Sequence, residues 1–120
     1  MDFTVAVTST FEASHMVDGD ERCESMHGHT WTVTTRVMQE RLGRHGEVSG
    51  ASGLRDAMHA LFLLYHQRHL NDKLVGAIPT AGGLAVNVME QLSLRFPRIE
   101  SVTVKMGEVE EVTVWRELRR

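Results

Sequence analysis

The stretch that decides the fold reads Cys23-Glu-Ser-Met-His27-Gly-His29 and leads into a β-branched run from Thr30 to Met38. Within that run, one side of a strand would carry Trp31, Val33, Thr35 and Val37. Such alternation with a period of two predicts a β-strand. His27 and His29 are also two residues apart, so on a strand both imidazole rings point to the same face.

A second strand is predicted just before this one, and it supplies a third imidazole. Residues 3–14 are rich in β-formers with partial alternation, and His15 follows at their end. If the two strands pair antiparallel, the ring of His15 reaches the face that carries His27 and His29. Three neutral imidazoles suit a tetrahedral Zn²⁺ and leave its fourth position open to water or substrate, as in catalytic zinc sites.

The rest of the chain predicts two helices and two more strands. Apolar residues at helical spacing indicate a helix over residues 54–66. A second helix is predicted to begin at Pro79-Thr80, with Thr80 as its N-cap, and to end at Phe96-Pro97. Residues 101–106 and 111–116 are predicted to form a hairpin. The order ββααββ predicts a single α+β domain over residues 1–120, with a four-stranded antiparallel sheet and two helices on one face. We expect subunits to cover the other face for each other.

Composition narrows the class of protein. A chain of 120 residues forms one domain, and its net charge of −3 argues against nucleic acid or an anionic membrane as the main partner. The single cysteine excludes an intrachain disulfide and fits a reducing compartment. The N-terminus does not have the pattern of a secretory signal, and no apolar run approaches the roughly 20 residues of a membrane helix. We therefore expect a soluble, cytoplasmic protein.

A set of motifs makes the zinc hypothesis more specific than the spacing of the histidines alone. They are Phe11-Glu-Ala-Ser-His15, Cys23-x-x-x-His27-Gly-His29, Leu70-Asn71-Asp72 and Pro79-Thr80-Ala81 with Leu84-Ala85. Together they resemble the 6-pyruvoyl-tetrahydropterin synthase family from about Phe11 to Trp115. The three-residue gap between the cysteine and His-Gly-His is more similar to its bacterial branch, the 6-carboxy-tetrahydropterin synthases of the queuosine pathway.

The resemblance implies a fold, a reaction and an assembly. Members are hexamers of two stacked trimers, with active sites between subunits. His15, His27 and His29 match the zinc ligands, and Cys23 matches the catalytic general base. The usual bacterial substrate is 7,8-dihydroneopterin triphosphate, and the products are 6-carboxy-tetrahydropterin, acetaldehyde and triphosphate. Two alternatives for Cys23 stay open: a fourth zinc ligand, which would close the site, and a buried inert thiol.

The chain departs from the family pattern at the proton relay. The family carries an Asp-His pair where this chain has His66 and Gln67. Glutamine is neither an acid nor a base, so His66 and His69 are the candidate catalytic replacements. The alternative is that these two histidines only place favourable charge near the C-terminus of the predicted helix.

The second departure concerns substrate binding. The glutamate that anchors the guanidine-like edge of the pterin is replaced by Met106, within Lys105-Met106-Gly107. Glu108, two residues on, is the candidate replacement, with a solvated turn residue as the alternative, and Thr80 is a further candidate contact. A third departure is Gly82-Gly83 at the start of the second helix.

The sequence thus predicts a zinc-dependent lyase of the 6-carboxy-tetrahydropterin synthase type that acts on a small molecule. Two alternatives remain open at this point. One is a divergent paralogue acting on another pterin or on a hydroxycarbonyl compound. The other is a zinc-stabilised oligomer without turnover that binds a pterin-like ligand or a protein partner.

Overall fold

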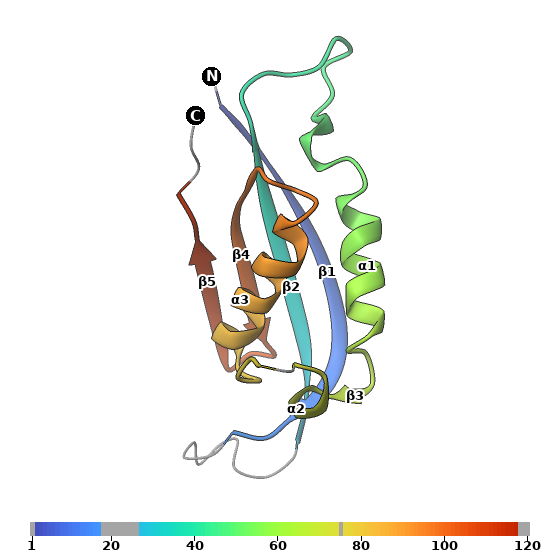
Figure 1. Ribbon diagram of the computed structural model, residues 1–120, viewed down its shortest axis with the longest axis vertical. Helices are drawn as coiled ribbons and strands as arrows, with labels where there is room; N and C mark the ends of the chain where they lie inside the picture. Colours follow the sequence, from blue (N-terminus) through green and yellow to red (C-terminus); the bar gives the residue numbers. More distant parts are fainter. Residues whose placement is uncertain (1, 18–26, 75, 118–120) are drawn as a thin grey trace.

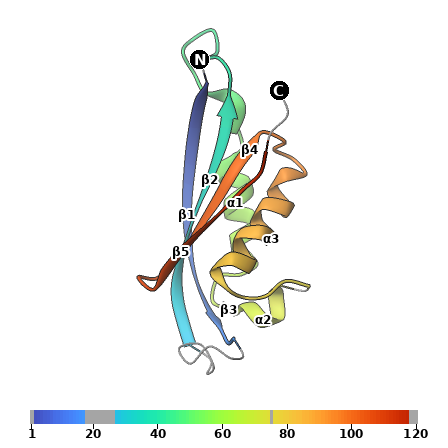
Figure 2. The same ribbon diagram turned by 90° about the vertical axis from the view of Figure 1, so that its left-hand side faces the viewer.

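The computed structural model describes residues 2–17, 27–74 and 76–117. Within these ranges, five strands form one sheet in the order β3-β1-β2-β4-β5. The strands are β1 (Phe3–His15), β2 (His27–Gln39), β3 (Arg68–His69), β4 (Ile99–Met106) and β5 (Glu110–Trp115). The helices are the 3-10 turn η1 (Ser49–Ala51) and the α-helices α1 (Leu54–Leu63), α2 (Leu70–Lys73) and α3 (Ala81–Ser93). Figures 1 and 2 show the helices packed on one face of the sheet.

The four predicted strands are present as β1, β2, β4 and β5, and each pairs antiparallel with its neighbour. The prediction of a purely antiparallel, four-stranded sheet with two helices is wrong in detail. A two-residue strand, β3, pairs parallel with β1 through Ala13↔Arg68 and Ser14↔His69, which makes the sheet mixed. The short helix α2 follows directly. Two residues of strand and four of helix are too short to give a periodic pattern in the sequence.

Helix α1 ends three residues before the predicted boundary. The chain leaves the helix in tight turns, with the Tyr65 amide donating to the carbonyl of Phe62 at 3.0 Å. Gln67 then adopts a left-handed conformation with φ of 56°, which is uncommon outside glycine and ends the helix. Its amide donates to the carbonyl of Glu12 at 2.6 Å, and this bond brings the chain back to the edge of the sheet.

The β1–β2 hairpin is the element that positions the site. The two strands pair over their whole length, from Phe3↔Gln39 to His15↔His27. Trp31 is fully buried, stacks with Phe11 at 6.4 Å between ring centroids and donates its indole N–H to the carbonyl of Ala13 at 3.0 Å. Burial of an aromatic side chain of this size dominates local packing energetics. Trp31 therefore fixes the hairpin two residue pairs away from His29.

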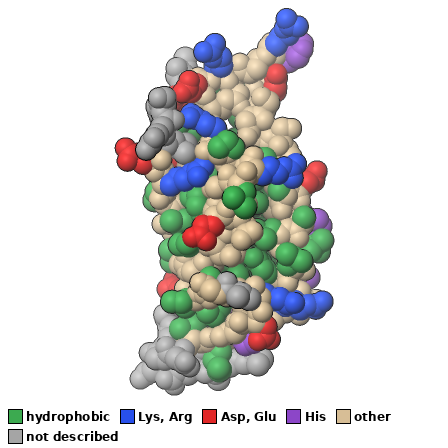
Figure 3. All heavy atoms as spheres, in the orientation of Figure 1, with side chains coloured by type: hydrophobic (Ala, Val, Ile, Leu, Met, Phe, Trp, Pro, Cys, Tyr) green, Lys and Arg blue, Asp and Glu red, His purple; other side chains and the backbone are tan. Residues whose placement is uncertain are grey.

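The two faces of the sheet differ in character. Apolar side chains of β1, β2 and β4 pack against α1 and α3, and Figure 3 shows hydrophobic side chains gathered in the middle of the helical side. The other face is open and rich in hydroxyl groups, with Thr8 bonded to Thr34 at 2.9 Å and Thr103 bonded to Thr113 at 2.8 Å. Trp115 of β5 is 63% exposed on this face. None of the helices in the described ranges has the length and apolar character needed to cross a membrane.

Candidate metal centre

Antiparallel pairing of β1 with β2 brings the three predicted histidines together. His15 lies directly opposite His27, and His29 lies opposite Ala13, so all three rings share one face of the hairpin. The ring centroids are 4.5 to 5.0 Å apart. One nitrogen from each ring lies within 4.8 Å of the other two, the arrangement of a three-histidine metal centre. The prediction that these residues form one cluster is confirmed.

A backbone carbonyl fixes the orientation of the most buried ring. His15 is 1% exposed, and its Nδ1 lies 2.6 Å from the carbonyl oxygen of Pro79, just before α3. Because a carbonyl only accepts, Nδ1 carries the proton, and Nε2 of the neutral ring keeps its lone pair. That Nε2 lies 3.0 Å from Nε2 of His27. A histidine held through its second nitrogen in this way is typical of metal ligands.

The third ring has a buried nitrogen that no protein group satisfies. Nε2 of His29 is buried and has no hydrogen-bond partner among the described residues. Burial lowers the pKa of His29 below its ordinary value of 6.5, and the charges of His15 and His27 lower it further. The neutral imidazole, which is the form that binds metals, is therefore favoured at this position.

These features test whether the donor set fits zinc. Zn–N bonds of about 2.0–2.1 Å in a tetrahedron place ligand nitrogens about 3.3 Å apart. The separation of 3.0 Å between the Nε2 atoms of His15 and His27 is close to that value. Three imidazoles with one orphaned lone pair fit Zn²⁺ or a similar divalent transition ion and leave a position for another ligand.

Two further contacts hold the end of β1 beside the cluster. Asn71 of α2 accepts the amide of Met16 through Oδ1 and donates to the carbonyl of Met16 through Nδ2, each at 2.9 Å. The Trp31 ring meets the His15 ring edge to face, with centroids 5.0 Å apart. The cluster is thus supported from β2, α2 and the segment that precedes α3.

The remaining predicted site residues lie elsewhere. Cys23 falls outside the described residues. Thr80 is the N-cap of α3, as predicted, and its Oγ1 accepts the amide of Gly83 at 3.0 Å. Glu108 lies in the β4–β5 turn with its side chain 91% exposed and 3.3 Å from Lys105. Met106 is only 2% exposed and pairs with Trp31 across β2 and β4, so the anchor position of the family pattern is filled by a buried thioether.

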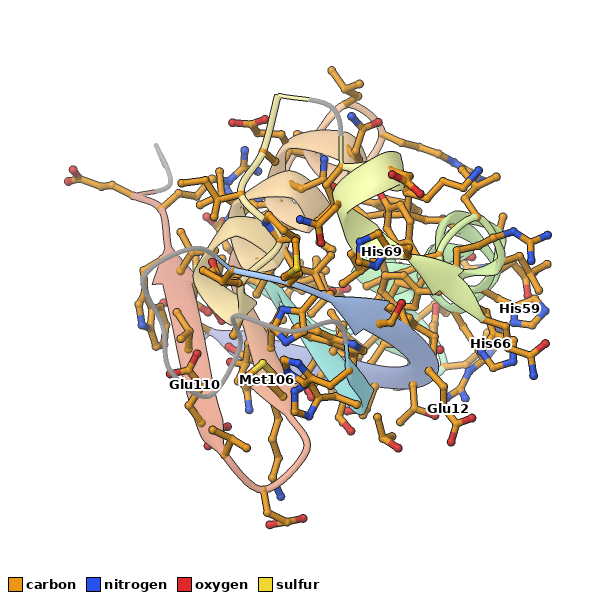
Figure 4. The ribbon with its side chains drawn as sticks, turned by 90° about the horizontal axis from the view of Figure 1, so that it is seen from below. Glu12, His59, His66, His69, Met106 and Glu110 are labelled. Carbon is orange, nitrogen blue, oxygen red and sulfur yellow. The ribbon has the colours of Figure 1, made fainter. Side chains whose placement is uncertain are left out.

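His66 and His69 occupy different environments (Figure 4). His66 lies beside His59 and Glu12 at the outer edge of the sheet, and its Nδ1 accepts the amide of Glu12 at 3.1 Å. His69 lies apart from them, next to β3 and α2, with Nδ1 3.0 Å from Oγ of Ser14.

His69 lines a cavity of about 550 Å³ at the end of the β1–β2 hairpin. The cavity is formed by Glu12, Ala13, Ser14, Gly28, His29, Thr30, Gln67, Arg68 and His69. Because Ser14 and His15 are consecutive on β1, their side chains point to opposite faces. The cavity and the histidine cluster therefore flank the same hairpin, and His29 belongs to both.

Three residues of this region make contacts that the sequence did not predict. Ser14 was seen only as part of the motif that ends in His15, and its partner His69 is 55 residues away. The carbonyl of Pro79 carries no side-chain signal at all. Asn71 was noted within Leu70-Asn71-Asp72, and that motif was the signal that pointed to it, although not to its contact with Met16.

Comparisons with known proteins agree on one family. The sequence model of the family described as 6-pyruvoyl tetrahydropterin synthase matches residues 4–119. A protein of Archaeoglobus fulgidus named "Putative 6-carboxy-5,6,7,8-tetrahydropterin synthase" is 22% identical over 116 residues, which are 97% of this chain and 95% of that protein.

Solved structures show the same fold at low identity. The 6-pyruvoyl tetrahydropterin synthase of Caenorhabditis elegans superimposes with a TM-score of 0.84 at 16% identity, covering 98% of this chain and 97% of that one. An uncharacterized protein of Wolinella succinogenes gives 0.76 at 16% identity, with 98% and 99% covered. The 6-pyruvoyltetrahydropterin synthase of Plasmodium vivax gives 0.73 at 13% identity, again with 98% and 99% covered.

Proposed function

Because the chain belongs to the 6-pyruvoyl tetrahydropterin synthase family, we propose that it is a zinc-dependent lyase of the 6-carboxy-tetrahydropterin synthase type. Its substrate would be 7,8-dihydroneopterin triphosphate, and its products 6-carboxy-tetrahydropterin, acetaldehyde and triphosphate. The observation that carries this proposal is the cluster of His15, His27 and His29 with its unsatisfied buried nitrogen. We place the reaction in the cytoplasm, where a single free cysteine stays reduced.

The protein's own residues prepare the site for this chemistry. His15, His27 and His29 would hold the ion, and the Pro79 carbonyl keeps His15 in the tautomer that offers Nε2. When bound, zinc polarises the oxygens of the substrate side chain and stabilises negative charge beside them. The Cys23 thiol is the proposed general base, because a nearby cation lowers the pKa of a thiol from about 8.5 towards neutrality.

The proposal includes an oligomer, a hexamer by family resemblance. The open hydroxyl-rich face of the sheet and the 63% exposure of Trp115 support cover by other subunits. An active site between subunits would also explain why His69, which is paired with Ser14, lies on the side of the hairpin away from the cluster. His69 of one copy would then serve the metal centre of another.

A second candidate is favoured by Met106. Its thioether cannot accept the paired hydrogen bonds of a guanidine-like edge, and it is buried in the core at 2% exposure. Glu108 is in contact with Lys105 and almost fully exposed in this structure. These facts support a paralogue that keeps the metal centre but acts on another pterin or on a hydroxycarbonyl compound.

The test is turnover of 7,8-dihydroneopterin triphosphate by the zinc-loaded protein, followed by mass spectrometry of the products. Formation of 6-carboxy-tetrahydropterin with acetaldehyde supports the first function. Cys23→Ala should abolish turnover, while His59→Gln, a change at an exposed position of α1, serves as the matched control. Absence of turnover with zinc bound would exclude that reaction, and a screen of other pterins and hydroxycarbonyl compounds would then separate the paralogue from a non-catalytic binding protein.

A further inference from the structure

Ser14 and His69 form a hydrogen-bonded pair in the wall of the cavity. Oγ of Ser14 lies 3.0 Å from Nδ1 of His69, and the pair is partly buried. The parallel pairing of β3 with β1 sets these two residues opposite each other, so their side chains share one face of the sheet. Helix α2 begins at the next residue, Leu70, which is fully buried and holds β3 in place. The ring of His69 is thus fixed through Nδ1, which leaves Nε2 for a ligand in the cavity.

The partner of His69 is a hydroxyl group, and this determines what the ring can do. A serine hydroxyl both donates and accepts. It can accept from Nδ1–H, which leaves a lone pair on Nε2, or it can donate to Nδ1, which leaves an N–H on Nε2. It can also accept from Nδ1–H of the imidazolium. The orienting bond therefore survives in all three protonation states of His69.

His66 provides the contrast within the same turn. Its Nδ1 accepts a backbone N–H, that of Glu12, at 3.1 Å. A backbone amide only donates, so this bond exists only when Nδ1 is unprotonated. Protonation of His66 at Nδ1 breaks a bond that ties the end of α1 to β1. His66 is therefore bound as a structural group, whereas the bond between His69 and Ser14 is compatible with a proton on either nitrogen of the His69 ring.

The cavity around His69 is lined by groups that form hydrogen bonds. Besides the pair, its lining includes Thr30, Glu12 and Gln67, residues whose side chains can form hydrogen bonds. Gly28 also lines it, and no described residue lies within 4 Å of the place that a Cβ there would occupy. A lining of this kind fits a hydroxylated organic molecule better than an apolar one.

We propose that this cavity, facing the metal centre of another copy in the proposed oligomer, binds the hydroxylated part of the substrate and that His69, positioned by Ser14, transfers protons there. The inference rests on the proposed function and assigns its proton relay to His69 rather than to His66. In the step, the O–H bond of a substrate hydroxyl breaks, its electron pair stays on the oxygen, and the proton forms an N–H bond at Nε2. That pair forms the second bond of a carbonyl as the adjacent C–C bond breaks, and the electrons of the broken bond remain on an enolate. The imidazolium returns the proton to the carbon of this enolate, so the ring ends neutral as it began.

The first experiment observes the pair without turnover. The ring nitrogens of ¹⁵N-labelled zinc-loaded protein report the tautomer of each histidine by NMR. We expect His69 to populate both neutral tautomers, and His66 only the one with the proton on Nε2. Ser14→Ala should shift the tautomer populations of His69, while Ser14→Thr should preserve them, because threonine keeps the hydroxyl. A single His69 tautomer that is the same in the wild type and Ser14→Ala overturns the proposal.

The second experiment measures kinetics with 7,8-dihydroneopterin triphosphate. His69→Gln should lower kcat about a hundredfold, the usual contribution of a proton-transfer residue. Ser14→Ala should lower kcat about fivefold with zinc content unchanged, and Ser14→Thr should restore it. His66→Gln should lower the midpoint of thermal unfolding, and its effect on kcat should be smaller than that of His69→Gln. If His69→Gln retains wild-type kcat, His69 is not the relay. Lack of turnover in the wild type counts against the proposed function, and the NMR result then decides whether Ser14 positions His69.

Discussion

Replacing His29 by Leu should weaken metal binding and, at the same time, stabilise the metal-free protein. Nε2 of His29 is buried and has no hydrogen-bond partner in the part of the chain that the structure describes. A buried unsatisfied group costs about 1–3 kcal/mol, and leucine of similar size removes that penalty. For a chain of this length each kcal/mol shifts the unfolding midpoint by about 3–6 °C. We therefore expect metal-free His29→Leu to unfold at least about 3 °C above the metal-free wild type.

The effect on metal affinity has the opposite sign. Structural zinc sites bind with about 10–16 kcal/mol from four ligands, or about 3 kcal/mol per ligand. Loss of one imidazole should thus weaken zinc binding at least about a hundredfold. His15→Leu is the matched control, because it removes a ligand from the same cluster but also removes the hydrogen bond to Pro79. It should weaken zinc binding similarly while destabilising the metal-free protein by about 1 kcal/mol.

Both quantities are measured on the same samples. Competition with a chromophoric chelator gives the zinc affinity, and calorimetry after exhaustive chelation gives the stability of the metal-free protein. Opposite signs of the stability change in the two variants support the difference between the rings: His15 is hydrogen-bonded to Pro79, whereas Nε2 of His29 has no hydrogen-bond partner among the described residues. If His29→Leu binds zinc as tightly as the wild type, or is destabilised as much as His15→Leu, the reasoning about the cluster is wrong.

Three further predictions follow from other contacts. The pKa of His29 is lowered by burial and by His15 and His27, so below pH 6.5 the unfolded chain binds more protons than the folded one. In urea unfolding of the metal-free protein, the free energy of unfolding should therefore be constant above that pH and should decrease as the pH falls below it. The decrease should be smaller in His29→Leu. Met106→Glu places a carboxylate at a position that is 2% exposed and should destabilise the protein by about 2–4 kcal/mol in urea unfolding; an unchanged midpoint would show that the site is open to water. Asn71→Ala loses both bonds to Met16 and should cost about 1–2 kcal/mol, whereas Asn71→Asp keeps the accepted bond and should cost about half as much, both read from thermal unfolding.

Much of the fold was predictable because its long elements carry strong periodic patterns. The β1–β2 hairpin follows from alternation around Trp31, and α1 and α3 follow from apolar stripes. The boundary at the end of α1 was not predictable, because it depends on a left-handed Gln67 whose amide is bonded to Glu12, 55 residues earlier. Strand β3 exists only through pairing with β1, and its two residues have no intrinsic preference that would reveal it.

The sequence by itself determined the histidine cluster, because a two-residue spacing on one strand and antiparallel pairing with another leave the rings no other face to occupy. It also determined that residue 106 is a methionine, whose thioether has no oxygen with which to accept paired hydrogen bonds. Only the tertiary structure decided that His15 is held by the carbonyl of Pro79 and that Met106 is buried. Only it could separate His66 from His69, because the partner of each ring comes from β1, more than 50 residues away, and is a backbone N–H for His66 but a serine hydroxyl for His69.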